Sequence, residues 1–126
     1  MLFVSGKSPH KAIAEDVYEF FTDLYEIESD VEVYHTDLSN DFALGFTEVN
    51  GDEQFVQIHN KLEESEYVTT LLHELCHVVQ NEQGLISDQV REDQAYHMEG
   101  ILYNKWCASR QGVHQTPTDP RGCAIL

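Results

Sequence analysis

The chain has 126 residues, enough for one domain with a modest core and too few for two. Its 23 acidic and 7 basic side chains give a formal net charge of −16, which disfavours nucleic acid and anionic membranes as partners. Most of the acidic residues fall between Glu15 and Glu66. Such a field would attract basic peptides or cationic protein surfaces, or serve only to keep the protein soluble.

Cysteine usage and the first residues bear on the compartment. The chain has three cysteines, Cys76, Cys107 and Cys123, and an odd number of cysteines cannot all pair with one another. The chain starts without the basic and apolar segments of a secretory signal. Together these observations predict a reducing, cytoplasmic location, with Cys76 packed into the core and not bound to a metal.

The first half of the chain predicts one helix and one strand. Ser8-Pro9 is typical of a helix start, and apolar residues recur at helical spacing from there to about Glu26. Residues 31–35 alternate in polarity, as a half-buried strand does.

A β-hairpin follows. Two β-prone runs, 42–49 and 52–59, flank Asn50-Gly51, a pair typical of a two-residue type I′ turn. With that turn, Phe46 would oppose Phe55. The second run comes directly before a helical segment and is a candidate edge of the sheet.

The second half predicts two helices. The first extends over about 65–83 and ends at Gly84, a residue typical of a helix C-cap. The second begins at Ser87 or Asp88 and carries a buried stripe. The members of that stripe are Ala95, Met98, Leu102 and Trp106.

The order of these elements predicts an α+β fold. We expect an N-terminal helix, a small and partly antiparallel sheet with a hairpin, and two antiparallel helices that pack on each other, with helices against one face of the sheet. Residues 1–110 form a single domain in this prediction, and 111–126 form an irregular tail.

The segment His73-Glu74-Leu75-Cys76-His77 contains the candidate metal-binding and catalytic residues. Residues i and i+4 share one face of a helix, so both imidazoles can reach one ion. The pattern H-E-x-x-H is the zincin signature, in which the carboxylate, here Glu74, is the general base. A catalytic zinc has three protein ligands. The antiparallel last helix offers Glu92 and Glu99, and geometry alone leaves both open.

The motif followed by Glu92-Asp93-Gln94-Ala95-Tyr96 resembles the small gluzincin-type zinc metallopeptidases. It is similar to the ImmA/IrrE-like peptidases and to short phage and bacterial proteins assigned as metallopeptidases, whose second helix carries E-x-[EQ]-A. The resemblance covers about 71–96. It implies a zincin-like domain that binds one Zn²⁺ per chain through His73, His77 and Glu92.

That resemblance implies a zinc-dependent peptidase acting on a peptide or protein substrate, with a basic one favoured by the charge. Tyr96 is the candidate residue for stabilising the oxyanion. Glu99 stays an alternative ligand, and so does His97, because SprT-like proteases use three histidines. A different class of function is also open: a weakly active or inactive zincin fold that serves as an acidic binding module or inhibitor for a basic partner.

Overall fold

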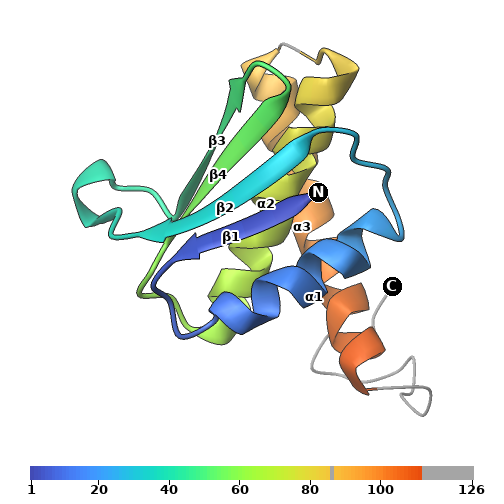
Figure 1. The fold of residues 1–126 in the computed structure, drawn as a ribbon. Coiled ribbons are helices and arrows are strands. Elements are labelled where there is room, and N and C mark those ends of the chain that lie inside the picture. Colours follow the sequence, from blue (N-terminus) through green and yellow to red (C-terminus); the bar gives the residue numbers. More distant parts are fainter. Residues whose placement is uncertain (86, 112–126) are drawn as a thin grey trace.

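A computed structural model describes residues 1–85 and 87–111. It contains three α-helices and a four-stranded mixed sheet, so the expected α+β class is confirmed (Figure 1). In chain order the elements are β1 (Leu2–Gly6), α1 (Lys11–Thr22), β2 (Asp30–Thr36), a short 3₁₀ helix η1 (Ser39–Asp41), β3 (Gly45–Asn50), β4 (Glu53–His59), α2 (Glu64–Gln83) and α3 (Asp88–Gln111).

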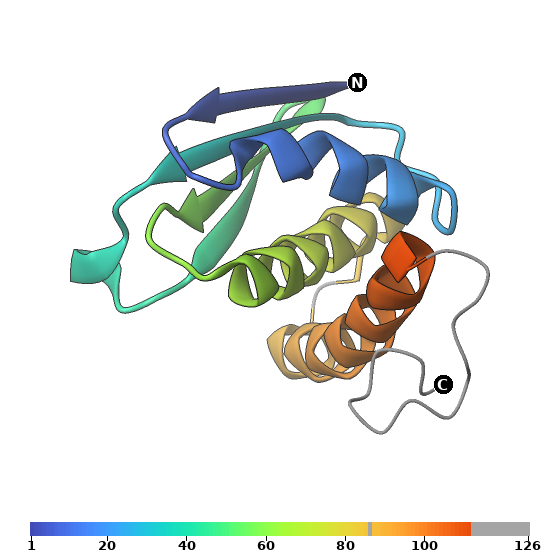
Figure 2. The same ribbon diagram turned by 90° about the horizontal axis from the view of Figure 1, so that it is seen from below.

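The sheet has the strand order β1-β2-β4-β3. Strands β1, β2 and β4 run parallel, whereas β3 is antiparallel to β4. Figure 2 shows that the helices all lie on one face of the sheet, with α1 and α2 next to it and α3 outside α2. Both the partly antiparallel sheet and the one-sided helical layer were expected from the sequence.

Helix α2 lies at the centre of the molecule, between the sheet and α3 (Figure 2). Alternate residues of β2 and β4, such as Val33 and Ile58, are buried against it. Leu71 and Leu75 of α2 are likewise fully buried. Ala95, Leu102 and Trp106 of α3 are buried as predicted, and Met98 is partly buried. Among the described residues, no helix has the length and apolar character needed to cross a membrane.

The ends of α2 follow the sequence signals, whereas those of α1 do not. Helix α2 has a reciprocal capping box between Glu63 and Glu66, and Gly84 ends it at φ 75°. Helix α1 was expected to begin at Pro9, but it begins at Lys11. The Ser8 hydroxyl accepts a hydrogen bond from the backbone N–H of His10 at 3.1 Å, which places a turn before the helix.

The hairpin has a different register from the predicted one. Phe46 pairs with Gln57 and not with Phe55, and Asn50 pairs with Glu53. The two loop residues are therefore Gly51 and Asp52. Only Gly51 has a positive φ, at 65°, so the turn is not type I′, which needs positive φ at both loop residues. Placing glycine first in the loop satisfies the left-handed position, and the two-residue shift preserves which face each side chain occupies.

Two further expectations about the sheet were wrong or incomplete. Strand β1 was not predicted; it pairs only with β2, which lies far along the chain. Strand β4 was expected at an edge, but it lies between β2 and β3. The hairpin signal reveals only the local β3–β4 pairing, whereas the parallel pairing of β4 with β2 joins segments separated by more than 20 residues. The predicted tail lies outside the described residues, apart from Gln111 at the end of α3.

Candidate metal centre

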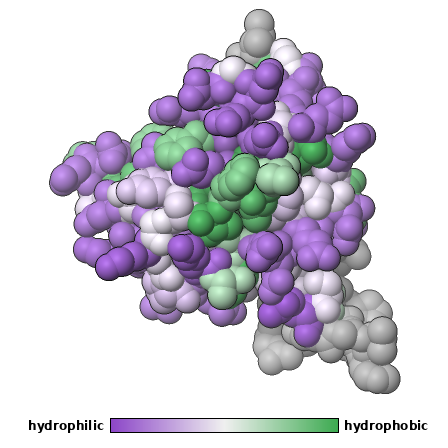
Figure 3. Space-filling view, in the orientation of Figure 1, coloured by the Kyte–Doolittle hydropathy of each residue, from purple (hydrophilic) through white to green (hydrophobic). Residues whose placement is uncertain are grey.

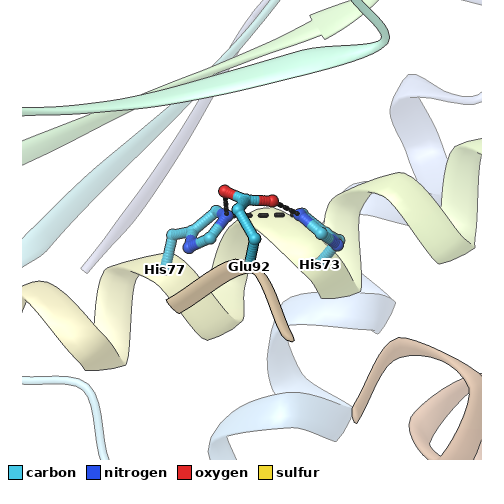
Figure 4. Close-up of side chains that lie close together, drawn as sticks. All are labelled: His73, His77 and Glu92. Atoms are coloured by element: carbon cyan, nitrogen blue, oxygen red, sulfur yellow. Dashed lines mark hydrogen bonds and ion pairs between the residues drawn. The ribbon is translucent and has the colours of Figure 1, made fainter. Parts of the chain in front are cut away.

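His73 and His77 lie one turn apart on α2, where the helix borders the start of α3 (Figure 4). Both imidazoles are almost fully buried. Their ring centroids are 4.8 Å apart with the planes nearly perpendicular, and their Nε2 atoms approach to 3.2 Å. The i, i+4 spacing therefore does what the motif predicts, because both Nε2 atoms point to one place.

Glu92 of α3 joins the two histidines (Figure 4). Its Oε1 lies 3.3 Å from Nε2 of His73, and its Oε2 lies 3.0 Å from Nε2 of His77. Among the described residues, these three form the group of His, Cys, Asp and Glu side chains that could hold a metal ion. Neither of the other candidates joins this group: His97 is exposed on α3, and Glu99 contacts His73 from a different side.

The Nδ1 atoms of the two histidines have partners of their own. Glu99 Oε1 lies 2.7 Å from Nδ1 of His73, and Gln80 Oε1 lies 2.8 Å from Nδ1 of His77. A carboxylate oxygen only accepts, so Nδ1 of His73 is the donor in the first contact. With Nδ1 engaged by Glu99, Nε2 is the ring nitrogen of His73 that faces Glu92 and His77 and is available to a metal ion.

The orientation of Gln80 decides the same question for His77. Its Nε2 donates to the backbone carbonyl of Arg91 at 3.0 Å and to Gln94 Oε1 at 2.8 Å. Because a carbonyl oxygen cannot donate, the Gln80 amide has to place its N–H₂ group there and its oxygen toward His77. His77 then donates from Nδ1, and its Nε2 faces the same point as Nε2 of His73. The Nδ1 contacts of both rings would therefore orient them to bind a metal through Nε2.

The donor set fits a divalent metal ion of the zinc type. It consists of two imidazole nitrogens and a carboxylate, one of the ligand sets found at catalytic zinc. A tetrahedral ion with bonds of about 2.0–2.1 Å separates its ligand atoms by roughly 3.3 Å. The Nε2–Nε2 distance of 3.2 Å is close to that edge. The side chain of Glu92 is 49% exposed, so this side of the group is open to solvent.

Glu74 is buried beside the two histidines and is held by β3. The Thr47 hydroxyl donates to its Oε1 at 2.6 Å. Burial raises the pKa of the Glu74 carboxyl, while the Thr47 hydrogen bond and the adjacent His77 act in the opposite direction. Gly45 of β3 leaves room for this side chain, since a Cβ there would come within 3.1 Å of Glu74 Cγ.

A cleft of about 650 Å³ opens over the group, between residues 42–47 and the facing sides of α2 and α3. His73, Glu74, His77 and Glu92 all line it. Tyr96 lines it too; its ring lies 4.8 Å from the His73 ring and is largely exposed to solvent. Every residue assigned to the site from sequence therefore lies at this cleft.

Sequence reasoning did not predict how the neighbouring residues support the site. Gln80 was a visible candidate, because it follows His77 by three residues on the same helix face. Glu99 was noted, but as an alternative ligand and not as the partner of Nδ1. Thr47 and Gly45 carried no signal, because their approach to Glu74 depends on how β3 lies over α2. Cys76 is buried in the core as expected, and burial raises the pKa of its thiol to about 12.

Comparison of the chain with protein-family models, with curated proteins and with solved structures found no match in any of the three.

Proposed function

We propose that the protein is a zinc-dependent peptidase. The observation that carries this proposal is the convergence of His73, His77 and Glu92 on one point, next to the buried carboxylate of Glu74, at an open cleft. Neither a purely structural metal nor a solvated acidic surface accounts for a carboxylate held beside the ligands without joining them. Structural zinc sites are also usually closed by four ligands rich in cysteine.

Glu74 is placed to move the proton. Zinc, when bound, would polarise the scissile carbonyl and acidify water beside it. Glu74 would take a proton from the attacking water at one carboxylate oxygen while the Thr47 hydroxyl holds the other, Oε1. As the water oxygen bonds to the carbonyl carbon and the C–N bond breaks, Glu74 would deliver the proton to the leaving amine.

The cleft offers a way to bind an extended peptide. Strand β3 is an edge of the sheet and its first residues line the cleft, so a substrate could add to it through main-chain hydrogen bonds. Tyr96 stands at the opposite wall, on α3, beside His73. We assign its hydroxyl the task of donating to the oxygen that becomes negative during attack.

The test is the Glu74→Gln variant, assayed on a mixture of unstructured peptides by mass spectrometry. This change removes the base but keeps the shape of the side chain, so we expect zinc content to stay unchanged and cleavage to fall by at least about 100-fold. Wild-type protein treated with a zinc chelator should lose cleavage to the same extent. Undiminished cleavage by zinc-loaded Glu74→Gln would refute the assignment of Glu74 as the base.

A further inference from the structure

The sheet has a second face, which none of the helices in the described part of the chain covers. The helices lie on one side of the sheet in Figure 2, and Figure 3, which has the orientation of Figure 1, shows hydrophobic side chains gathered near the centre of the molecule with hydrophilic ones around them. Alternation along the strands puts three aromatic residues on the side of the sheet away from the core, one from each of β1, β2 and β4. We call the side chains of Phe3, Tyr34 and Phe55 the aromatic face.

Strand pairing brings these side chains together. Phe3 pairs with Glu32, and Glu32 pairs in turn with Phe55, so the two phenylalanines flank one carboxylate. Tyr34 and Phe55 are stacked, with ring centroids 6.0 Å apart. Phe3 is 51% exposed and Tyr34 is 37% exposed. Aromatic side chains that stay exposed in a cluster are typical of interaction surfaces.

The aspartate, glutamate, lysine and arginine side chains at outward positions of this face are all acidic, and one of them, Asp30, lies 3.3 Å from the N-terminal amine of Met1. The strands alternate, so the positions that share the outward side with the aromatic face follow from the pairing. Asp30 and Glu32 occupy it on β2, Glu53 on β4 and Glu48 on β3, where Glu48 lies opposite Phe55. None of the outward positions on the four strands holds lysine or arginine.

We infer that the aromatic face binds a segment of a partner protein that combines basic and apolar side chains. The apolar residues of that segment would cover the rings, and its lysines or arginines would pair with the surrounding carboxylates or stack on the aromatic rings. A second copy of the chain is a poor occupant, because it would place these carboxylates against identical ones. The inference does not rest on the proposed peptidase activity, since the residues that alternate with the aromatic face along the strands are the ones buried in the core with α2.

Fluorescence anisotropy with a labelled peptide of alternating lysine and leucine tests this inference, with a glutamate–leucine peptide as the control probe. We expect the cationic probe alone to bind. The double variant Tyr34→Ser/Phe55→Ser should weaken binding at least tenfold, as loss of central aromatic contacts does at interfaces. The matched control is Leu24→Ser, which removes an apolar side chain exposed to a similar extent beyond α1 and should leave the affinity within about twofold.

Two further double variants distinguish ion pairing of the probe with the carboxylates around the aromatic face from a general attraction of the probe to the net negative charge of the protein. Glu48→Lys/Glu53→Lys should weaken binding about tenfold more than Glu15→Lys/Glu19→Lys, which makes the same charge change on α1. Equal losses in the two pairs would overturn the inference, and so would probe-induced NMR shifts confined to the cleft.

Circular dichroism checks that each variant is folded. Should the double aromatic variant unfold, Phe3→Ser, at a half-exposed position on the edge strand, replaces it with the same expectation. Binding should be the same in Glu74→Gln as in wild type, so failure of the peptidase proposal would leave this result intact.

Discussion

At the scale of single residues, the site depends on side chains that would not touch the metal. Glu99 and Gln80 accept from the Nδ1 atoms of the two histidines and so direct both Nε2 atoms to one point. Gln80 also ties α2 to α3 through the Arg91 carbonyl, so the helix that carries Glu92 is held at the level of the histidines. Such partners orient ligands and raise their basicity.

Glu99→Ala should therefore weaken zinc binding although Glu99 is not a ligand. We expect the affinity to fall by about 10–100-fold, the usual cost of removing an outer partner of a ligating histidine. Competition with a chromogenic chelator measures it, with Asp93→Ala as the control, an exposed acidic change on the same helix. An unchanged affinity in Glu99→Ala would mean that the contact with His73 does not tune the site.

Thr47 should affect the catalytic rate but not the binding of zinc. A hydrogen bond to a charged group contributes about 1.5–3 kcal/mol, so Thr47→Val should lower kcat by roughly tenfold or more, with zinc content unchanged. Thr47→Ser keeps the hydroxyl and should restore most of the rate. Steady-state kinetics on a cleaved peptide separates kcat from KM; a change confined to KM would contradict a role in positioning Glu74.

At the scale of elements, α2 is joined to a distant segment of the chain near its C-terminal end. Near its C-terminus, Glu82 accepts hydrogen bonds from the backbone N–H groups of Glu28 and Ser29 and from the Ser29 hydroxyl, which joins α2 to the segment before β2. Burial alone would raise the pKa of Glu82, but the hydrogen bonds from Ser29 and Glu28 outweigh it and lower that pKa.

The hydrogen bonds that the Glu82 carboxylate accepts make part of the protein's stability depend on pH. Because the folded-state pKa of Glu82 is below the unfolded value of about 4.3, its stabilisation is complete above that pH and is lost as the pH falls through the folded-state pKa. Glu82→Gln should lower the free energy of unfolding at pH 7 by about 1 kcal/mol, given a partly exposed site. Urea titrations at several pH values should show this difference shrinking below about pH 4. A difference independent of pH would contradict the account.

The same scale shows what could be predicted from the sequence. Helix α2 was placed to within a residue because Gly84 and the apolar spacing are local signals, and the two histidines followed from helix geometry. The choice of Glu92 over Glu99 as the third ligand depended on the resemblance to gluzincins, because the positions of the two residues along the last helix allowed either one to reach the histidines. Strand β1, the interior place of β4 and the approach of Thr47 to Glu74 depend on pairings between distant segments, which local patterns do not specify.

At the scale of the whole molecule, the net charge of −16 opposes folding through self-repulsion. Added salt should relieve it, so Tm should rise as NaCl increases from about 0.01 M to 0.15 M, where the screening length falls from about 30 Å to about 8 Å. Differential scanning calorimetry measures the shift. A Tm that falls or stays constant over this range would show that the acidic residues are already compensated in the fold.

The central claim concerns the metal centre, and zinc content by elemental analysis tests it most directly. Untagged wild-type protein, Glu92→Ala and the control Asp93→Ala would be purified side by side, and each would be equilibrated with one equivalent of zinc and desalted before the measurement. We predict about one zinc per chain in the wild type and in Asp93→Ala, and a large loss in Glu92→Ala, because removing the carboxylate leaves two ligands. Wild-type protein that takes up no zinc, or Glu92→Ala that holds as much as the wild type, would contradict the three-ligand site.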